Sequence, residues 1–312
     1  MTETLTSVQK DALLKKNTYI FTGALAVLLI AAAFIFGYYV LAIAAVSYAV
    51  SFVVEILFSK LRKKEFDYGW MVTPLLIALL MPPAIPLWTV GIAAFFGVFF
   101  GKNIFGGSGK YIFSPALVGV LFVLISFPAQ MATAWIDPQT ADFFTGATPL
   151  SLFNRGLPFN YSTLDLLMGS TIGTLGETFR LGIIVLGLLL IVLKVSDWRI
   201  PLSYLGSFFV ITGLAFLISP DSIGKDPVTS LLLGGILFGA FFIAVDPVTA
   251  PVTSKGRIVY GIGLGLLTFV IRNFGTFHEG VTFSIIIMNA ISPLIDNKTV
   301  KEIDVTSEEV AA

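Results

Sequence analysis

The residues best suited to chemistry form a short turn of hydroxyl-bearing and small side chains. Thr145, Gly146, Ala147 and Thr148 lie in the longest polar break between hydrophobic segments, and Pro149 follows them. A threonine hydroxyl can form a phosphoester, and small neighbours leave room for a modifying enzyme to reach it. Pro149 fixes the backbone angle after the turn. Composition alone favours an ordinary loop turn, so both interpretations remain open at this point.

The composition excludes several other kinds of chemistry. The chain has no cysteine and one histidine, so it cannot supply the usual ligands of a haem or an iron–sulfur cluster. We expect no metal site, and any electrons must travel on an organic cofactor held without metal–ligand bonds. The formal net charge is zero, which gives no indication of nucleic-acid binding.

A glycine-rich stretch resembles a phosphate-binding loop but has the wrong spacing. It reads Gly106-Gly107-Ser108-Gly109-Lys110. The first glycine of such a loop is replaced by Ile104, and Tyr111 stands where Ser or Thr would bind magnesium. We therefore interpret the stretch as a tight turn between broken helices.

Four acidic residues near apolar segments are candidates for a cation path, because charge near the bilayer is costly and usually functional. Asp246 lies in a proline-interrupted break, where free backbone carbonyls could join it around a small cation. Asp67 begins the third segment, Asp296 ends the last one, and Glu177 closes a glycine-rich stretch. The alternatives are solvation at the interface for Asp67 and Asp296, and a local ion pair with Arg180 for Glu177.

The elements that must position these residues are membrane helices. The 312 residues are 56% hydrophobic and 12% charged, with a mean hydropathy of +0.92. A soluble domain carries about 25% charged residues. The apolar runs lack the alternation of a β-barrel. We predict an all-α polytopic membrane protein.

Apolar runs near the roughly 20 residues of a membrane-crossing helix recur along the chain. We predict eleven segments, at about residues 18–36, 38–58, 69–82, 86–101, 112–128, 161–176, 180–195, 199–218, 229–245, 258–271 and 281–295. Several are shorter than a full crossing. We interpret 161–176 as a re-entrant or half-helix, which leaves about ten transmembrane helices.

Basic residues predict the orientation, since they favour the cytoplasmic side. They cluster before the first segment and after the second and fourth, whereas Arg155 is the only one between Pro128 and Tyr161. This places the N-terminal segment 1–17 inside and, after five crossings, the loop 129–160 with Thr148 outside. The two membrane parts are then 18–128 and 161–296, and the tail 297–312 is cytoplasmic. The N-terminus shows no cleavage-type site, so the first span is expected to remain as an anchor.

Two short matches indicate an internal repeat. Lys102-Asn103 followed by Gly106 resembles Arg272-Asn273 followed by Gly275, and the proline break at 82–86 resembles the one at 246–251. The predicted topology places the first pair inside and the second outside. This is the arrangement of an inverted repeat of about five spans, in which broken helices build a central site.

Taken together in order, these motifs identify a resemblance to a known family. The chain resembles the D subunit of the Rnf ferredoxin:NAD oxidoreductase and the homologous B subunit of the sodium-pumping NADH:quinone reductase. The matching segments, over about residues 67 to 296, are Asp67 to Thr73, Pro82-Pro83, Gly101 to Gly107, Phe113 to Ala116, Thr145 to Thr148, Gly176 to Thr178, Asp246 to Thr249, Lys255 to Arg257, Glu279-Gly280 and Pro293 to Asp296. Each is weak alone, but the ordered set is specific.

The resemblance implies two inverted five-helix halves with a fold similar to urea transporters. It also implies FMN joined through its phosphate to Thr148 by a separate flavin transferase, and a second, non-covalent flavin (riboflavin) in some members. Acids matching Asp67, Asp246 and Asp296 are linked to sodium uptake in the quinone reductase relatives. The usual Ser-Gly-Ala-Thr turn begins here with Thr145, a conservative change.

We therefore expect a flavin-carrying subunit of an ion-translocating electron-transport complex in the cytoplasmic membrane of a bacterium or archaeon. Its partners would be the other membrane and peripheral subunits, the flavin transferase, and Na⁺ or H⁺. The Rnf type is favoured over the quinone reductase type. The alternatives are a small-solute channel or secondary transporter on the same inverted plan, and a structural scaffold.

Overall fold

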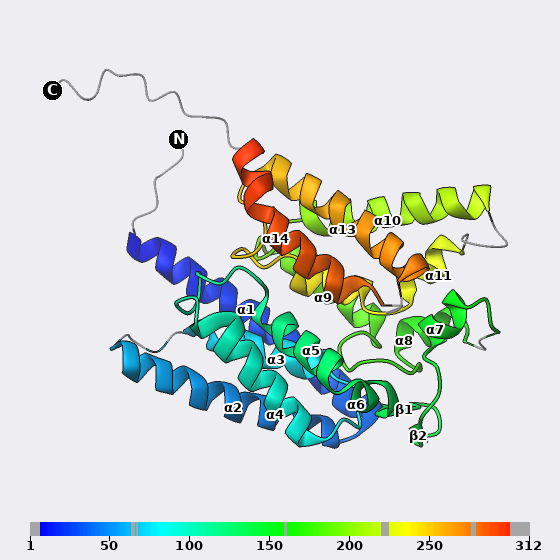
Figure 1. The fold of residues 1–312 in the computed structure, drawn as a ribbon, viewed down its shortest axis with the longest axis horizontal. Coiled ribbons are helices and arrows are strands. Elements are labelled where there is room, and N and C mark those ends of the chain that lie inside the picture. Colours follow the sequence, from blue (N-terminus) through cyan, green and yellow to red (C-terminus); the bar gives the residue numbers. More distant parts are fainter. Residues whose placement is uncertain are drawn as a thin grey trace.

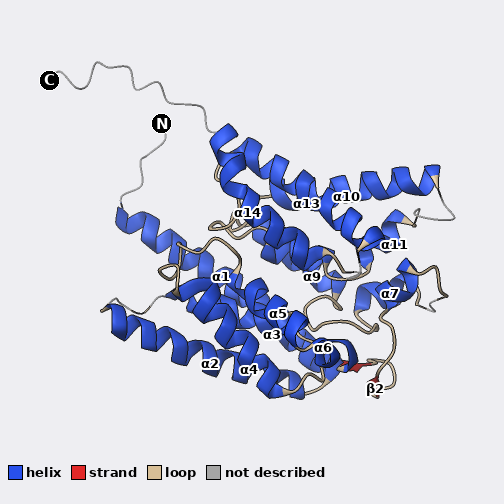
Figure 2. Ribbon diagram, in the orientation of Figure 1, coloured by secondary structure: helices blue, strands red, loops and turns tan. Residues whose placement is uncertain are grey.

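The computed structural model describes residues 7–63, 66, 68–158, 161–219, 225–275 and 279–299, with side chains from residue 12 onward. Within them the fold is almost entirely helical, and its only strands form one short pair (Figure 2). The predicted all-α class is confirmed.

The first part of the chain forms one group of helices, drawn from blue to green in Figure 1. Its elements are α1 (Ser7–Phe36), α2 (Tyr39–Arg62), the 3₁₀ helix η1 (Tyr68–Met71), α3 (Val72–Leu79), α4 (Leu87–Phe96), the π-helix η2 (Gly97–Asn103) and α5 (Pro115–Ser126). α1 begins well before the predicted start of the first span, because the polar segment with its lysines continues the same helix.

The last part forms a second group, drawn from green to red and lying beside the first (Figure 1). Its elements are α9 (Arg180–Val192), α10 (Arg199–Ile218), α11 (Pro227–Leu232), α12 (Ile236–Phe238), the π-helix η3 (Gly239–Ile243), α13 (Ser254–Phe274) and α14 (Val281–Thr299). α10 packs along α13, as α2 packs along α4 in the first group.

The polar connection between the groups has structure of its own. It contains α6 (Pro128–Thr133), the antiparallel strands β1 (Trp135–Ile136) and β2 (Phe143–Phe144), α7 (Pro149–Asn154) and α8 (Thr163–Met168). The predicted segment 161–176 contains only this six-residue helix α8, which is too short to cross a membrane.

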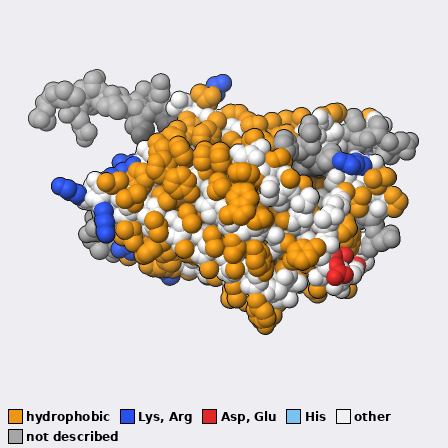
Figure 3. All heavy atoms as spheres, turned by 60° about the horizontal axis from the view of Figure 1, so that its bottom comes forward, with side chains coloured by type: hydrophobic (Ala, Val, Ile, Leu, Met, Phe, Trp, Pro, Cys, Tyr) orange, Lys and Arg blue, Asp and Glu red, His pale blue; other side chains and the backbone are white. Residues whose placement is uncertain are grey.

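In the described part of the chain, four helices are long and apolar enough to cross a membrane: Ala12–Phe36, Tyr39–Arg62, Arg199–Ile218 and Ser254–Phe274. Their outer faces carry exposed large apolar side chains, such as Phe34 (83% exposed) and Leu217 (78%). Figure 3 shows apolar side chains covering the middle of one face, with most of the visible basic side chains toward the left end and acidic ones toward the right. Such a surface is stable only against lipid or protein, so this is a multi-pass membrane protein.

The broken segments satisfy their backbone groups inside the protein, as a membrane interior requires. After α8 the chain runs against the C-terminal end of α3, where Leu175 N–H donates to the carbonyl of Met81 (3.1 Å) and Gly176 N–H to that of Leu79 (2.6 Å). A Cβ atom on Gly176 would lie 3.0 Å from the Leu79 carbonyl oxygen. The close approach therefore requires glycine at this position.

Candidate functional site

Thr148 occupies the N-cap of α7. Its Oγ1 accepts a hydrogen bond from the backbone N–H of Ser151 at 3.3 Å, and Pro149 takes the first helical position, where a missing N–H is tolerated. The side chain is half-buried. A hydroxyl oxygen has two lone pairs and this bond uses one, so Oγ1 is held in place while it retains the capacity to form an ester.

The turn before Thr148 is closed by the ring of Phe144. A Cβ atom on Gly146 would lie 2.4 Å from Phe144 Cζ, which is shorter than any normal contact. Thr145 and Gly146 are exposed, and Ala147 is half-buried. A side chain at Gly146 would therefore displace the Phe144 ring or the turn that carries Thr148.

A cavity of about 360 Å³ lies against this turn, and Gly146, Ala147 and Thr148 form part of its wall. Cofactor and ligand pockets measure roughly 300–1,000 Å³. Most of the remaining wall is apolar and comes from several elements, including Leu80, Val120, Leu124, Met131, Trp135, Ile172, Leu233 and Phe283. Thr148 thus lies at the wall of a space large enough for a small organic cofactor.

Two carboxylates line the same cavity. Glu177 Oε1 accepts a hydrogen bond from the backbone N–H of Thr174 at 2.8 Å. A Cβ atom on Gly235 would lie 2.6 Å from Glu279 Oε1 and 3.3 Å from Glu177 Oε2. Both side chains therefore converge on this glycine, although 102 positions separate them in the sequence.

Arg180 supplies a positive charge to the cavity wall. It is 2% exposed, and its Nη1 donates to the carbonyl of Leu166 (2.6 Å), to Thr171 Oγ1 (2.9 Å) and to the carbonyl of Thr178 (3.3 Å). Within the described part of the chain, Glu177 and Arg180 form no direct ion pair. The local pair that their spacing allows is therefore replaced by bonds from Arg180 to neighbouring oxygens.

Arg272 holds the backbone at the edge of the cavity. Its Nε donates to the carbonyl of Glu279 (3.0 Å), its Nη1 to that of Ser230 (2.7 Å) and its Nη2 to that of Leu233 (3.0 Å). The end of α13 is thereby tied to the break after α11 and to the start of α14.

Asp246 lies in the connection between η3 and α13. Its carboxylate accepts hydrogen bonds from the Tyr111 hydroxyl (2.9 Å) and the Val248 N–H (3.0 Å). Nearby, the buried Lys102 ammonium lies 2.7 Å from the Glu55 carboxylate. The acid is thus held by partners from both helix groups.

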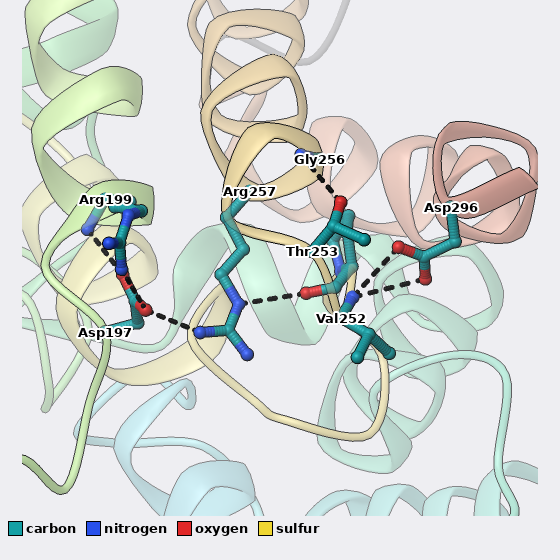
Figure 4. Close-up of polar contacts among 8 residues, drawn as sticks. Asp197, Arg199, Val252, Thr253, Gly256, Arg257 and Asp296 are labelled. Atoms are coloured by element: carbon teal, nitrogen blue, oxygen red, sulfur yellow. Dashed lines mark hydrogen bonds and ion pairs between the residues drawn. The ribbon is translucent and has the colours of Figure 1, made fainter. Parts of the chain in front are cut away.

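Asp296 lies near the end of α14 and accepts hydrogen bonds from the backbone N–H of Val252 at 3.0 and 3.2 Å (Figure 4). In the same view, Arg257 joins Asp197 (2.5 Å) to the carbonyl of Pro251 (3.0 Å). Asp246 and Asp296 therefore hold the two ends of one connection, residues 246–253.

The four predicted cation-path residues do not gather at one point. Asp246 and Asp296 share the connection 246–253, Glu177 lines the cavity beside Thr148, and Asp67 lies outside the described residues. The sequence argument gave Glu279 no role and treated Arg180 only as an ion-pair partner. In the sequence, Glu279 and Arg180 are marked only by a charge beside a glycine-rich break. That feature does not show that three separate connections meet at one cavity.

Comparison with known proteins decides the family. The chain matches the model of the NQR2, RnfD, RnfE family over residues 2–303. The chain belongs to this family. It is 37% identical over 278 residues to the D subunit of the Na⁺-translocating ferredoxin:NAD⁺ oxidoreductase complex of Acetobacterium woodii, covering 87% of this chain and 85% of that relative.

Two further relatives come from related complexes. The B subunit of the Na⁺-translocating NADH-quinone reductase of Ectopseudomonas mendocina is 38% identical over 272 residues, covering 81% of this chain and 66% of that relative. The D subunit of the ion-translocating oxidoreductase complex of Shewanella frigidimarina is 33% identical over 300 residues, covering 84% and 85%. All three relatives are subunits of ion-translocating oxidoreductases, and this chain spans only about two thirds of the quinone reductase relative.

Proposed function

We propose that this protein is the flavin-carrying membrane subunit of an Rnf-type, ion-translocating complex that passes electrons between ferredoxin and NAD. The observation that carries the proposal is the position of Thr148 Oγ1 at the wall of a cofactor-sized cavity. FMN attached there through its phosphate would supply electron transfer without metal ligands, which this cysteine-free chain lacks.

The residues around the cavity fit such a group. Thr148 presents a hydroxyl in a fixed position, and Gly146 keeps the turn close to the Phe144 ring. The mostly apolar wall with a few converging polar side chains matches the usual make-up of a cofactor pocket. Thr148 would hold the phosphate end, while the apolar wall excludes water from the rest of the group.

The relatives come from both complex types at similar identity, 37% for the D subunit of Acetobacterium woodii and 38% for the B subunit of Ectopseudomonas mendocina. We propose the Rnf type for this chain. Its partners are then the other subunits of such a complex and the flavin transferase that attaches FMN.

We propose that the two helix groups are inverted halves with a fold similar to urea transporters. Lys102, near the end of η2, pairs with Glu55 in the region of Asp246, whereas Arg272, near the end of α13, binds the backbone beside the cavity. The matching motifs therefore lie at opposite ends of the molecule. With the basic end in the cytoplasm of a bacterium or archaeon, the Thr148 turn faces the exterior.

The coupled ion, Na⁺ or H⁺, is proposed to pass acids that include Asp246, Asp296, Asp67 and Glu177. Asp296 and the cavity residue Phe283 lie 13 positions apart on α14, which is about 20 Å along a helix. Two unit charges about 20 Å apart interact by only about 0.8 kcal/mol at an effective protein dielectric of about 20. Coupling between the flavin and the connection 246–253 is therefore proposed to be conformational.

One gel tests the attachment. The chain is produced together with its flavin transferase, run on a denaturing gel and viewed under ultraviolet light, alongside Thr148→Val and Thr145→Val. We expect a fluorescent band in the native chain and in T145V, and none in T148V. Intact-mass measurement should show the added FMN in the same two samples.

Two results would contradict the proposal. A band that persists in T148V would move the attachment elsewhere. An unmodified native chain, in the presence of a transferase shown to be active on another substrate, would favour the small-solute channel or transporter.

A further inference from the structure

Arg180 is a buried charge whose hydrogen bonds are incomplete. A buried guanidinium is normally paired or fully hydrogen-bonded, since taking it out of water is costly. Arg180 Nη1 has three oxygen acceptors, but its Nε is buried without a hydrogen-bond partner among the described residues. The guanidinium is thus held through Nη1, while its Nε–H has no acceptor among the described residues.

Arg272 provides an internal comparison. It is also buried, but its Nε, Nη1 and Nη2 all donate to carbonyl oxygens of the chain. The hydrogen bonds of Arg272 tie three backbone segments together, so its role is structural. Arg180 has an unbonded Nε–H, and of the two arginines it is the one that lines the cavity beside Thr148.

We propose that Arg180 faces the flavin attached to Thr148 and stabilises the negative charge that the flavin gains on reduction. This inference rests on the proposed function. Uptake of two electrons and one proton leaves the reduced flavin as an anion with a single charge. A guanidinium already fixed in a water-poor cavity favours that anion more than solvent does, because no reorganisation is needed.

Arg180 therefore raises the reduction potential of the flavin. Glu177 and Glu279 lie on the same wall, but burial raises the pKa of both carboxyls, and repulsion by Glu177 raises that of Glu279 further, to about 7. The two close carboxyls therefore carry less than two negative charges at neutral pH, whereas the Arg180 guanidinium stays charged.

The test is a spectroelectrochemical titration of the purified, flavin-loaded full chain, with dithionite as reductant and soluble mediators. Arg180→Gln removes the charge, Arg180→Lys keeps it, and Arg155→Gln removes an exposed charge at the end of α7 that does not line the cavity. Flavin fluorescence on a denaturing gel first establishes that each variant carries the cofactor.

For R180Q we expect the ratio of reduced to oxidised flavin at a fixed potential to fall about tenfold. For a two-electron couple this is a shift of about 30 mV to more negative potential. R180K should retain most of the native potential, and R155Q all of it. A native potential in flavin-loaded R180Q, or an equal shift in R155Q, would overturn the inference.

Arg180→Lys keeps the inference testable if R180Q does not fold. Lysine retains the positive charge, so the potential should stay close to the native value. A shift of about 30 mV or more to negative potential in flavin-loaded R180K would reject the assignment. Failure of the proposed function itself is a separate result, because the native chain would then show no fluorescent band at all.

Discussion

At the scale of single residues, position distinguishes two identical hydroxyls. Thr145 and Thr148 belong to the same turn, but Thr148 caps α7 and lines the cavity, whereas Thr145 is exposed and does not line it. The residues alone could not separate them. Only the resemblance to the family selects Thr148 from the sequence, and the structure adds the cavity as an independent reason.

Gly146 should support flavin attachment by leaving room for the Phe144 ring beside the turn. In Gly146→Ala the new Cβ would meet the Phe144 ring at 2.4 Å, so the turn must shift or the ring must move. We expect flavin fluorescence per mole of chain to fall several-fold. The double variant G146A with Phe144→Leu should recover it, and an unimpaired single variant would show that the turn tolerates the shift.

At the scale of elements, uninterrupted helices were predictable and broken ones were not. The predicted segment 199–218 has the bounds of α10, but 229–245 divides into α11, α12 and η3. Apolarity reports which residues avoid water, whereas the break depends on backbone geometry such as the positive φ (70°) of Gly234. The cavity was unpredictable for a related reason, since Thr148, Glu177 and Glu279 come from three different connections.

Asp197, in the connection between α9 and α10, binds Arg257 of α13, and this link should make stability depend on pH. Partial burial acts to raise the pKa of its carboxyl, but the Arg199 N–H and the Arg257 guanidinium outweigh this and hold the pKa below its usual value. A lowered folded-state pKa stabilises the protein above the ordinary Asp pKa of about 4, and this stabilisation is lost as pH falls through the folded value.

Asp197→Asn should therefore lower the stability in detergent at pH 7 by about 0.2–1 kcal/mol, the range for partly exposed ion pairs. The difference in Tm between native and variant protein should shrink as the pH falls below about 4. Asp142→Asn, in the exposed polar loop, is the matched control. A difference in Tm that is constant with pH would show that the Asp197 charge does not contribute.

At the scale of the whole molecule, the two ends are chemically distinct. α1 begins and α14 ends at one end, while α6 and α7 lie at the other (Figure 1). The loop between η2 and α5 contains Ser108, and the turn after β2 contains Thr145; both residues are exposed or partly exposed. α5 is the main helix between them, and its 12 residues span only about 18 Å.

A helix of that length is shorter than the roughly 30 Å hydrocarbon core of a bilayer. Ser108 and Thr145 can lie on opposite sides only if the chain before α5 dips into the membrane, as the broken-helix plan requires. Because the native sequence has no cysteine, Ser108→Cys and Thr145→Cys each introduce a single thiol. We expect a membrane-impermeant maleimide to label T145C in intact cells and S108C only in inverted vesicles, with the native chain unlabelled in both. Labelling of both variants from one side would mean that α5 does not complete a crossing, and it would remove the inverted arrangement along with the external position of Thr148.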